Sequence, residues 1–449
     1  MKKTILMTLC VISLGAFAQK KTVSNTKTLP PVSDNTKANA VIYEVNIRQY
    51  SPEGTFNAFA KDLPQLKKLG IKILWIMPIH PIGIENRKEG LGSYYSVKDY
   101  RGINPEFGNL QDFENLVNSA HANGMYVIID WVPNHTAWDH PWVKQHPDYY
   151  AKDKDGKMIS PFDWTDVVKL NYENPETRKA MVADMSYWLT TAKIDGFRCD
   201  VAGEVPTDFW KDATTQLNKI KPIFMLAEAE KPELLKNGFD MYYGWDEHHI
   251  MNGIAQGKKT VKDFDDYIKK MDTTLEKDDI IMNLTSDHDE NSWNGTEYER
   301  LGDAVEVFAA MTYAIPGMPL IYNGQEYDFN RRLKFFTKDE ITRVKGKMFP
   351  IYEKLSALKN SNSALNTGAN PASYTRIITS ADEQVLAFSR EKKGQKIIFM
   401  ANLSKENQSF TTTVNGTYLD YMSGKKITLK KGEKWNYKPW EYHIFIVKQ

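Results

Sequence analysis

The feature that most constrains the fold is a regular alternation of short apolar runs and longer amphipathic segments between residues 38 and 360. Amphipathic helices between strands predict parallel strand pairing through right-handed crossovers. Eight such strands are the number that a (β/α)8 (TIM) barrel requires, so we predict an α/β barrel over 39–360. The predicted strands are 41–47, 71–77, 126–132, 194–201, 223–227, 239–243, 280–284 and 319–322. The main predicted helices are 57–69, 110–123, 175–191, 208–220, 261–275, 301–314 and 338–358.

Two regions depart from this alternation. The connection after the third strand is long and rich in aromatic residues, and it predicts a short inserted subdomain over 136–172. Loops that follow barrel strands lie at the face where barrel enzymes keep their sites. From 365 to 449, short alternating runs separated by turns predict a C-terminal antiparallel β-sandwich domain.

The amino terminus has the pattern of an export signal. Lys2 and Lys3 precede an apolar run that ends in small residues, so we predict a signal peptide over 1–18 and a periplasmic or extracellular location. The run is too short to span a bilayer, so no membrane anchor is expected. Residues 19–38 are polar, include Pro30 and Pro31, and predict a flexible lead-in. A formal charge of +1 gives no indication of a nucleic-acid partner.

Acidic side chains follow three of the predicted strands. Arg198 and Asp200 are two residues apart at the end of the fourth strand, so both side chains leave the same face. An adjacent guanidinium favours the ionised form of a carboxyl group, and an ionised carboxylate can act as a nucleophile. Taken alone, this pair favours a structural ion pair at a strand end over a catalytic role.

The spacing of the other acids favours a shared site. Glu228 follows Asp200 by 28 residues and Asp289 follows Glu228 by 61, and one β/α unit is roughly 30 residues long. We therefore expect all three carboxylates at the same mouth of the barrel. Glycoside hydrolysis needs such a set, with one carboxylate attacking the anomeric carbon and a protonated partner donating to the leaving oxygen. A metal site is the alternative, but Arg198 would compete with a cation for Asp200.

Six short segments, in order, resemble those of the alpha-amylase family of glycoside hydrolases. They are DWVPNH at 130–135, GFRCD at 196–200, Glu228, the pair His288 and Asp289, the segment GSYYSVKDY at 92–100, and GMPLIYNGQE at 317–326. The resemblance implies a TIM barrel, a retaining mechanism and an alpha-glucan or maltooligosaccharide as the substrate. It also implies that the chemistry requires no cofactor.

The resemblance also implies a role for each matching residue. Asp200 would be the nucleophile, Glu228 the general acid and then the base, and Asp289 the stabiliser of the transition state. The predicted substrate-binding residues are Arg198, which holds Asp200 ionised, His135 and His288, which bind sugar hydroxyls, and Tyr95, which stacks beneath the ring. Asp130 would orient Arg198 from behind the site.

Some features depart from the family pattern. Asp287 stands where the family commonly has Asn, and the inserted subdomain is short. Asn134 corresponds to a position that is often a calcium ligand, so a structural calcium ion stays open. Two further functions fit the same residues: a transglycosylase, which passes the sugar to another sugar, and an inactive glucan-binding protein. The leading prediction is a hydrolase of alpha-glucosidic bonds, mainly alpha-1,4.

Overall fold

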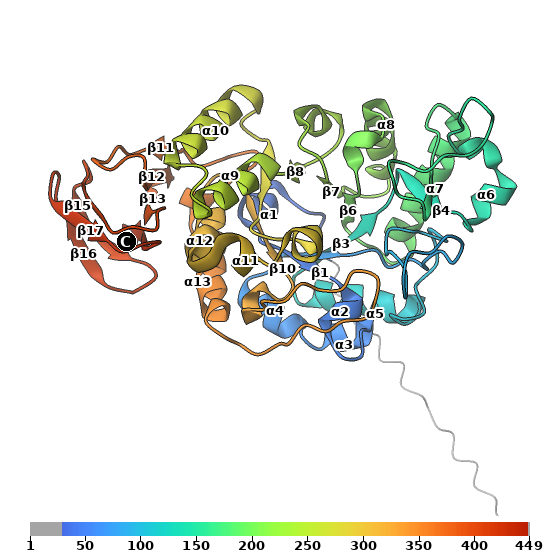
Figure 1. Ribbon diagram of the computed structural model, residues 1–449, viewed down its shortest axis with the longest axis horizontal. Helices are drawn as coiled ribbons and strands as arrows, with labels where there is room; N and C mark the ends of the chain where they lie inside the picture. Colours follow the sequence, from blue (N-terminus) through green and yellow to red (C-terminus); the bar gives the residue numbers. More distant parts are fainter. Residues whose placement is uncertain (1–28, 448–449) are drawn as a thin grey trace, which may run out of the picture.

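In the computed structural model, which describes residues 29–447, a closed parallel barrel forms the centre of the molecule (Figure 1). The barrel order is β1-β10-β9-β8-β7-β6-β3-β2, so consecutive barrel strands are neighbours. Every predicted strand is confirmed. The strands are β1 (Ile42–Val45), β2 (Ile73–Ile76), β3 (Tyr126–Trp131), β6 (Gly196–Cys199), β7 (Phe224–Ala227), β8 (Met241–Tyr243), β9 (Ile280–Asn283) and β10 (Met318–Tyr322).

The side chains of the barrel strands alternate between two apolar layers. Along β2, Ile73 and Trp75 belong to the cluster inside the barrel, whereas Leu74 and Ile76 pack in the layer beneath the helices. This is the period-two alternation of a strand. Cys199 lies in the outer layer with no exposed surface, as its alternation with Arg198 and Asp200 predicts.

Most of the α-helices surround the barrel, and one lies in the segment inserted after β3. The α-helices are α1 (Asp34–Asn39), α2 (Ile47–Tyr50), α3 (Phe56–Ala60), α4 (Leu63–Leu69), α5 (Leu110–Ala122), α6 (Pro141–Gln145), α7 (Pro175–Thr191), α8 (Thr207–Leu217), α9 (Trp245–Ala255), α10 (Val261–Thr274), α11 (Glu297–Leu301), α12 (Val305–Ala314) and α13 (Met348–Ser361).

Three predicted helices differ from the structure by more than a few residues or are divided. The segment 57–69 is divided into α3 and α4, because Pro64 at the start of α4 cannot continue a helix. The helix predicted over 301–314 starts at Val305, since Gly302 takes a φ of 57°. The helix predicted over 338–358 starts at Met348. Pro350 in its first turn excludes a preceding helical turn, and the Ile341 N–H instead donates to the Gln49 carbonyl.

The two regions outside the barrel lie at opposite ends of the molecule (Figure 1). The inserted segment consists of β4 (His135–Ala137), α6 and β5 (Val167–Lys169), with β4 and β5 paired antiparallel. In the C-terminal domain, a six-stranded antiparallel sheet is covered by a two-stranded one, and Phe410 and Tyr437 fill the core between them. The strands are β11 (Thr375–Arg376), β12 (Val385–Lys392), β13 (Gln395–Asn402), β14 (Gln408–Thr411), β15 (Gly416–Asp420), β16 (Lys426–Leu429), β17 (Lys434–Tyr437) and β18 (Tyr442–Ile446).

The end of the predicted lead-in is structured. Leu29 and Val32 pack against the apolar cluster inside the barrel, and Ser33 caps α1, so the prediction of a flexible segment is wrong for 29–38. Burial of apolar side chains compensates there for the lost chain entropy. The predicted signal peptide, 1–18, lies outside the described residues. Within 29–447, no helix is both long and apolar enough to cross a membrane.

Candidate active site

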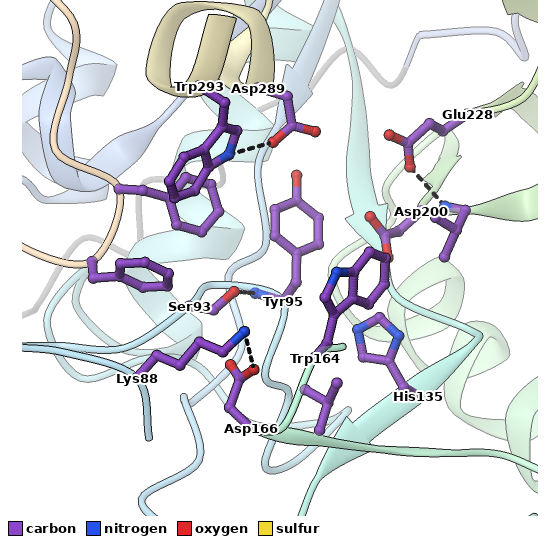
Figure 2. A pocket seen from close by; sticks show the side chains of 14 residues that line it. Lys88, Ser93, Tyr95, His135, Trp164, Asp166, Asp200, Glu228, Asp289 and Trp293 are labelled. Atoms are coloured by element: carbon purple, nitrogen blue, oxygen red, sulfur yellow. Dashed lines mark hydrogen bonds and ion pairs between the residues drawn. The ribbon is translucent and has the colours of Figure 1, made fainter. Parts of the chain in front are cut away.

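A cavity of about 260 Å³ opens at the carboxyl ends of the barrel strands (Figure 2). Asp200 follows β6, Glu228 follows β7, and Asp289 lies in the loop after β9, and all three line this cavity. The spacing of the three carboxylates in the sequence therefore correctly predicts that they lie at the same cavity. The remaining lining residues are Lys88, Ser93, Tyr95, His135, Trp164, Asp166, Val167, Val201, Trp293, Phe335 and Phe336.

Arg198 lies beneath the cavity and joins three carboxylates. Its Nη1 lies 2.8 Å from Asp130 Oδ1 and 3.2 Å from Asp200 Oδ1. Its Nη2 lies 3.0 Å from Glu228 Oε2, which also accepts a hydrogen bond of 2.7 Å from the Val201 N–H. One fully buried guanidinium therefore fixes the positions of both Asp200 and Glu228.

The charges around Arg198 favour retention of a proton. Burial and the nearby Glu228 carboxylate raise the pKa of Asp200 well above its usual value, while Arg198 acts in the opposite direction. Burial also raises the pKa of Asp130, again against the effect of Arg198. A single cation cannot balance three carboxylates, so the group holds a proton more tightly than isolated carboxyl groups do.

A second polar chain supports the floor of the cavity. The Tyr95 hydroxyl donates to Asp130 Oδ2 at 2.9 Å and lies 2.8 Å from His288 Nε2. The other ring nitrogen of His288, Nδ1, lies 2.6 Å from Glu44 Oε1 at the end of β1. Nearby carboxylates, chiefly those of Asp289 and Glu44, outweigh burial and raise the pKa of His288 well above 6.5. A protonated His288 can donate to both Glu44 and Tyr95.

The predicted substrate-binding residues divide into two groups. Tyr95 and His135 line the cavity, and burial lowers the pKa of His135 to about 4, which keeps its ring neutral near pH 7. Arg198 and His288 do not line it; they contact Asp200, Glu228, Tyr95 and Asp289 from behind. Their direct binding of a sugar stays a prediction. Asp130 has no exposed surface and contacts Arg198, as predicted.

The structure separates Glu228 from the neighbouring acids. Glu230 points to the start of α9, where its Oε2 accepts from the Asp246 N–H at 3.1 Å, and Glu204 is exposed. Asp287 is fully buried, and its Oδ1 accepts from the Glu290 N–H at 2.8 Å. Asp287 therefore begins the turn that carries Asp289, and it does not line the cavity.

Asn134, the possible calcium ligand, makes protein contacts with both its side chain and its backbone carbonyl, and calcium binding there stays a prediction. The side-chain amide of Asn134 lies 3.2 Å from His135 Nδ1, and its backbone carbonyl accepts from the Leu170 N–H. In the part of the chain that the structure describes, no group of three or more His, Cys, Asp or Glu side chains is placed to hold a metal ion. The polar contacts of Asn134 position His135.

Four lining residues were not found from the sequence: Lys88, Asp166, Phe335 and Phe336. Phe335 and Phe336 pack beside Asp289 against Trp293, with ring centroids 5.2 and 5.9 Å from that of Trp293. Lys88 and Asp166 lie on two loops and form an ion pair of 3.3 Å. Loop residues of this kind carry no periodicity, and only the length and aromatic content of the loops after the second and third strands indicated this region from the sequence.

The fold and the site define a barrel protein with clustered carboxylates at the carboxyl ends of its strands, an arrangement typical of barrel enzymes. The family model described as "Alpha amylase, catalytic domain" matches residues 28–167 and 158–357. The chain therefore belongs to the alpha-amylase family.

Solved structures agree over nearly the whole chain. The noncanonic maltogenic alpha-amylase AmyB from Thermotoga neapolitana has a TM-score of 0.84 and 29% identity, covering 92% of this chain and 99% of that one. An alpha-amylase from Lactobacillus plantarum has a TM-score of 0.83 and 30% identity, covering 93% of this chain and 100% of that one. Both similarities include the C-terminal domain.

Among curated relatives, Alpha-amylase 3 of Dictyoglomus thermophilum is 25% identical, covering 83% of this chain and 86% of that protein. Alpha-amylase MalA of Haloarcula japonica is 23% identical over 86% of this chain, which spans 58% of that protein. An alpha-1,4-glucan:maltose-1-phosphate maltosyltransferase of Picrophilus torridus is 25% identical, covering 79% of this chain and 59% of that protein. The relatives thus include both amylases and a glycosyl transferase.

Proposed function

We propose that the protein is a retaining glycoside hydrolase that cleaves alpha-glucosidic bonds, mainly alpha-1,4, in starch-like glucans or maltooligosaccharides. The observation that carries the proposal is the binding of Asp200 and Glu228 to the two terminal nitrogens of one guanidinium, at 3.2 and 3.0 Å. Both carboxyl groups are therefore held by the same cation at the base of the cavity. A retaining mechanism, in which one carboxylate attacks directly and the other donates a proton, is the one that membership of the alpha-amylase family implies.

In this mechanism, Asp200 attacks the anomeric carbon while Glu228 donates a proton to the leaving oxygen. A covalent glycosyl intermediate forms on Asp200, and Glu228, now ionised, takes a proton from the water that hydrolyses it. Asp289 lies in the same cavity and stabilises the positive charge that develops on the ring. The Arg198 guanidinium, 3.2 Å from Asp200 Oδ1, favours the ionised form of the nucleophile.

Replacement of the nucleophile tests the proposal. Asp200→Asn should lower kcat on soluble starch and maltooligosaccharides by about 1,000-fold or more, because no covalent intermediate can form. The matched control is Glu204→Gln, four residues further along and exposed, which should retain turnover. Wild-type turnover in Asp200→Asn would contradict the assignment.

Hydrolysis and transfer share the first step and differ in the acceptor. The maltosyltransferase among the relatives makes transfer the second candidate. Chromatography of products from pure maltotriose separates the two, since transfer gives products longer than the substrate and hydrolysis gives only shorter ones. Starch affinity without turnover would indicate a glucan-binding protein instead.

We also propose export through the amino-terminal signal, from the Lys2 and Lys3 residues and the apolar run that follows them. The mature protein should begin at Gln19 and occur in the periplasm or the medium. Amino-terminal sequencing of the fractionated protein tests both points.

A further inference from the structure

Three loops meet along one side of the cavity and form a wall there. They are the loop after β2 (77–109), the inserted segment (135–169) and the loop after β10 (323–347). Lys88 Nζ in the first lies 3.3 Å from Asp166 Oδ1 in the second, and the Leu91 N–H donates to the Phe336 carbonyl of the third at 2.7 Å. The loop after β2 thus bridges the other two.

Further contacts fix this wall in place. Ser96 Oγ donates to the Asp166 carbonyl at 3.2 Å, and the Ala137 N–H donates to the Val97 carbonyl at 2.8 Å. The Asp166 side chain is only 5% exposed, so its charge is far less screened than that of a surface carboxylate. Because Asp166 is held by buried backbone contacts, Lys88 has a fixed partner at the edge of the cavity.

The wall continues past the loop after β10 to Asp289. The rings of Phe335 and Phe336 pack against Trp293, and Trp293 Nε1 donates to Asp289 Oδ1 at 3.2 Å. Figure 2 places Glu228 at the opposite end of the cavity from Lys88 and Asp166. The cavity, at about 260 Å³, is slightly smaller than the roughly 300–1,000 Å³ of common ligand pockets, so it holds only a short part of a glucan.

The direction of the substrate follows from the role of Glu228, and this step rests on the proposed function. As the general acid, Glu228 lies beside the leaving oxygen, so the reducing-end part of the chain extends on its side of the cavity. The sugar attacked by Asp200 must then extend toward Lys88 and Asp166. A chain that continued beyond its 4-hydroxyl group in that direction would meet the ion pair.

We propose that the enzyme acts on the non-reducing ends of glucan chains, and that the Lys88 and Asp166 pair is the specificity-determining barrier that ends the glycone side of the site. A free chain end presents hydroxyl groups there, to which the Lys88 ammonium donates and from which the Asp166 carboxylate accepts. An internal sugar presents a glycosidic substituent in their place and is excluded by the wall.

The test compares 4-nitrophenyl maltoheptaoside with the same compound carrying a 4,6-ethylidene block on its non-reducing end. Products are followed by chromatography. The wild-type enzyme should have a kcat/KM about 100-fold lower on the blocked compound, because the block meets the wall. Lys88→Ala, which shortens a half-exposed side chain, should raise the ratio of blocked to free turnover about tenfold.

The matched control is Lys98→Ala. Lys98 pairs with Asp139 at 3.0 Å between the same two segments but does not line the cavity, so its removal should leave the ratio unchanged. Equal wild-type kcat/KM on both compounds would overturn the chain-end proposal. An unchanged ratio in Lys88→Ala, or an equal rise in Lys98→Ala, would overturn the role of the pair. Failure to cleave either compound would instead overturn the proposed function, and the inference with it.

Discussion

At the scale of single residues, the site depends on buried side chains that hold the cavity-lining side chains in position. Arg198 fixes two carboxylates, and Tyr95 joins His288 to Asp130 through one hydroxyl group. Neither Arg198 nor His288 reaches the cavity, yet each determines where a lining carboxylate points. Buried polar contacts of this kind limit the movement of the side chains that they join.

Glu290 supports the turn that carries Asp289 and should make stability pH-dependent. Burial disfavours its charge, but contacts with His248 at 3.0 Å and Asn294 at 2.7 Å, together with nearby Arg300, lower its pKa from 4.5 to about 2. A carboxylate with a depressed folded-state pKa stabilises the protein above its unfolded pKa, and this stabilisation is lost as pH falls.

Glu290→Gln should therefore lower the free energy of unfolding by about 2 kcal/mol at pH 7. The difference from wild type should shrink between pH 4.5 and about 2, as the wild-type carboxylate becomes protonated. Urea unfolding across this range measures it, with the exposed Glu204→Gln as control. A difference that stays constant with pH would show that the charge of Glu290 is not the cause.

At the scale of elements, close strand packing positions Arg198. Gly196 begins β6 opposite Phe224 of β7 with a φ of 156°, and a Cβ added there would lie 1.8 Å from the Phe224 carbonyl oxygen. Only glycine allows this approach, because the neighbouring atom belongs to the backbone and cannot move aside. The position of Arg198 thus depends on the close approach of β6 to β7, which the absence of a side chain at Gly196 allows.

Gly196→Ala should destabilise the protein by about 3 kcal/mol through this clash and lower activity in the part that still folds. Gly124→Ala is the control, since Gly124 has a φ of 82° but no atom within 4 Å of the added Cβ. It should cost only about 1 kcal/mol, the price of the backbone conformation alone. Thermal unfolding compares the two, and equal losses would contradict a steric cause.

At the scale of the whole molecule, buried basic side chains join the C-terminal domain to the barrel. Arg390 in β12 is fully buried, and its nitrogens donate to the Ile315 carbonyl at 3.0 Å, just past α12, and to the Asn366 carbonyl at 2.6 Å. Lys359 in α13 donates to the Gly317 and Leu365 carbonyls at 2.7 Å. These contacts supply donors to buried carbonyl oxygens, while burial lowers the pKa of Arg390 to about 9 and that of Lys359 well below 10.5.

Arg390→Met should lower the free energy of unfolding by about 3 kcal/mol, because it leaves several buried carbonyls without donors. Calorimetry should then show the two domains unfolding in separate transitions. Arg332→Met is the control, since its guanidinium is 48% exposed and its ion pair with Glu299 contributes little. If Arg390→Met unfolded in one transition, as is expected of the wild type, other contacts would be coupling the two domains.

The sequence by itself determined the barrel and the three clustered carboxylates. Period-two alternation assigns Arg198 and Asp200 to one face, and the length of a β/α unit brings Glu228 and Asp289 to the same mouth. These are local rules, and they hold for each element separately. They failed at helix starts such as that of α13, where a proline and loop contacts override a helical pattern.

Only the tertiary structure decided which groups meet between elements. Glu44 and His288 are 244 residues apart, and Lys88 pairs with Asp166 across two loops without periodicity. The structure likewise placed Glu228 in the cavity and Glu230 at the start of α9. A sequence pattern specifies the face that a side chain leaves, whereas a contact between loops depends on where the whole fold brings them, and that position has no local signature.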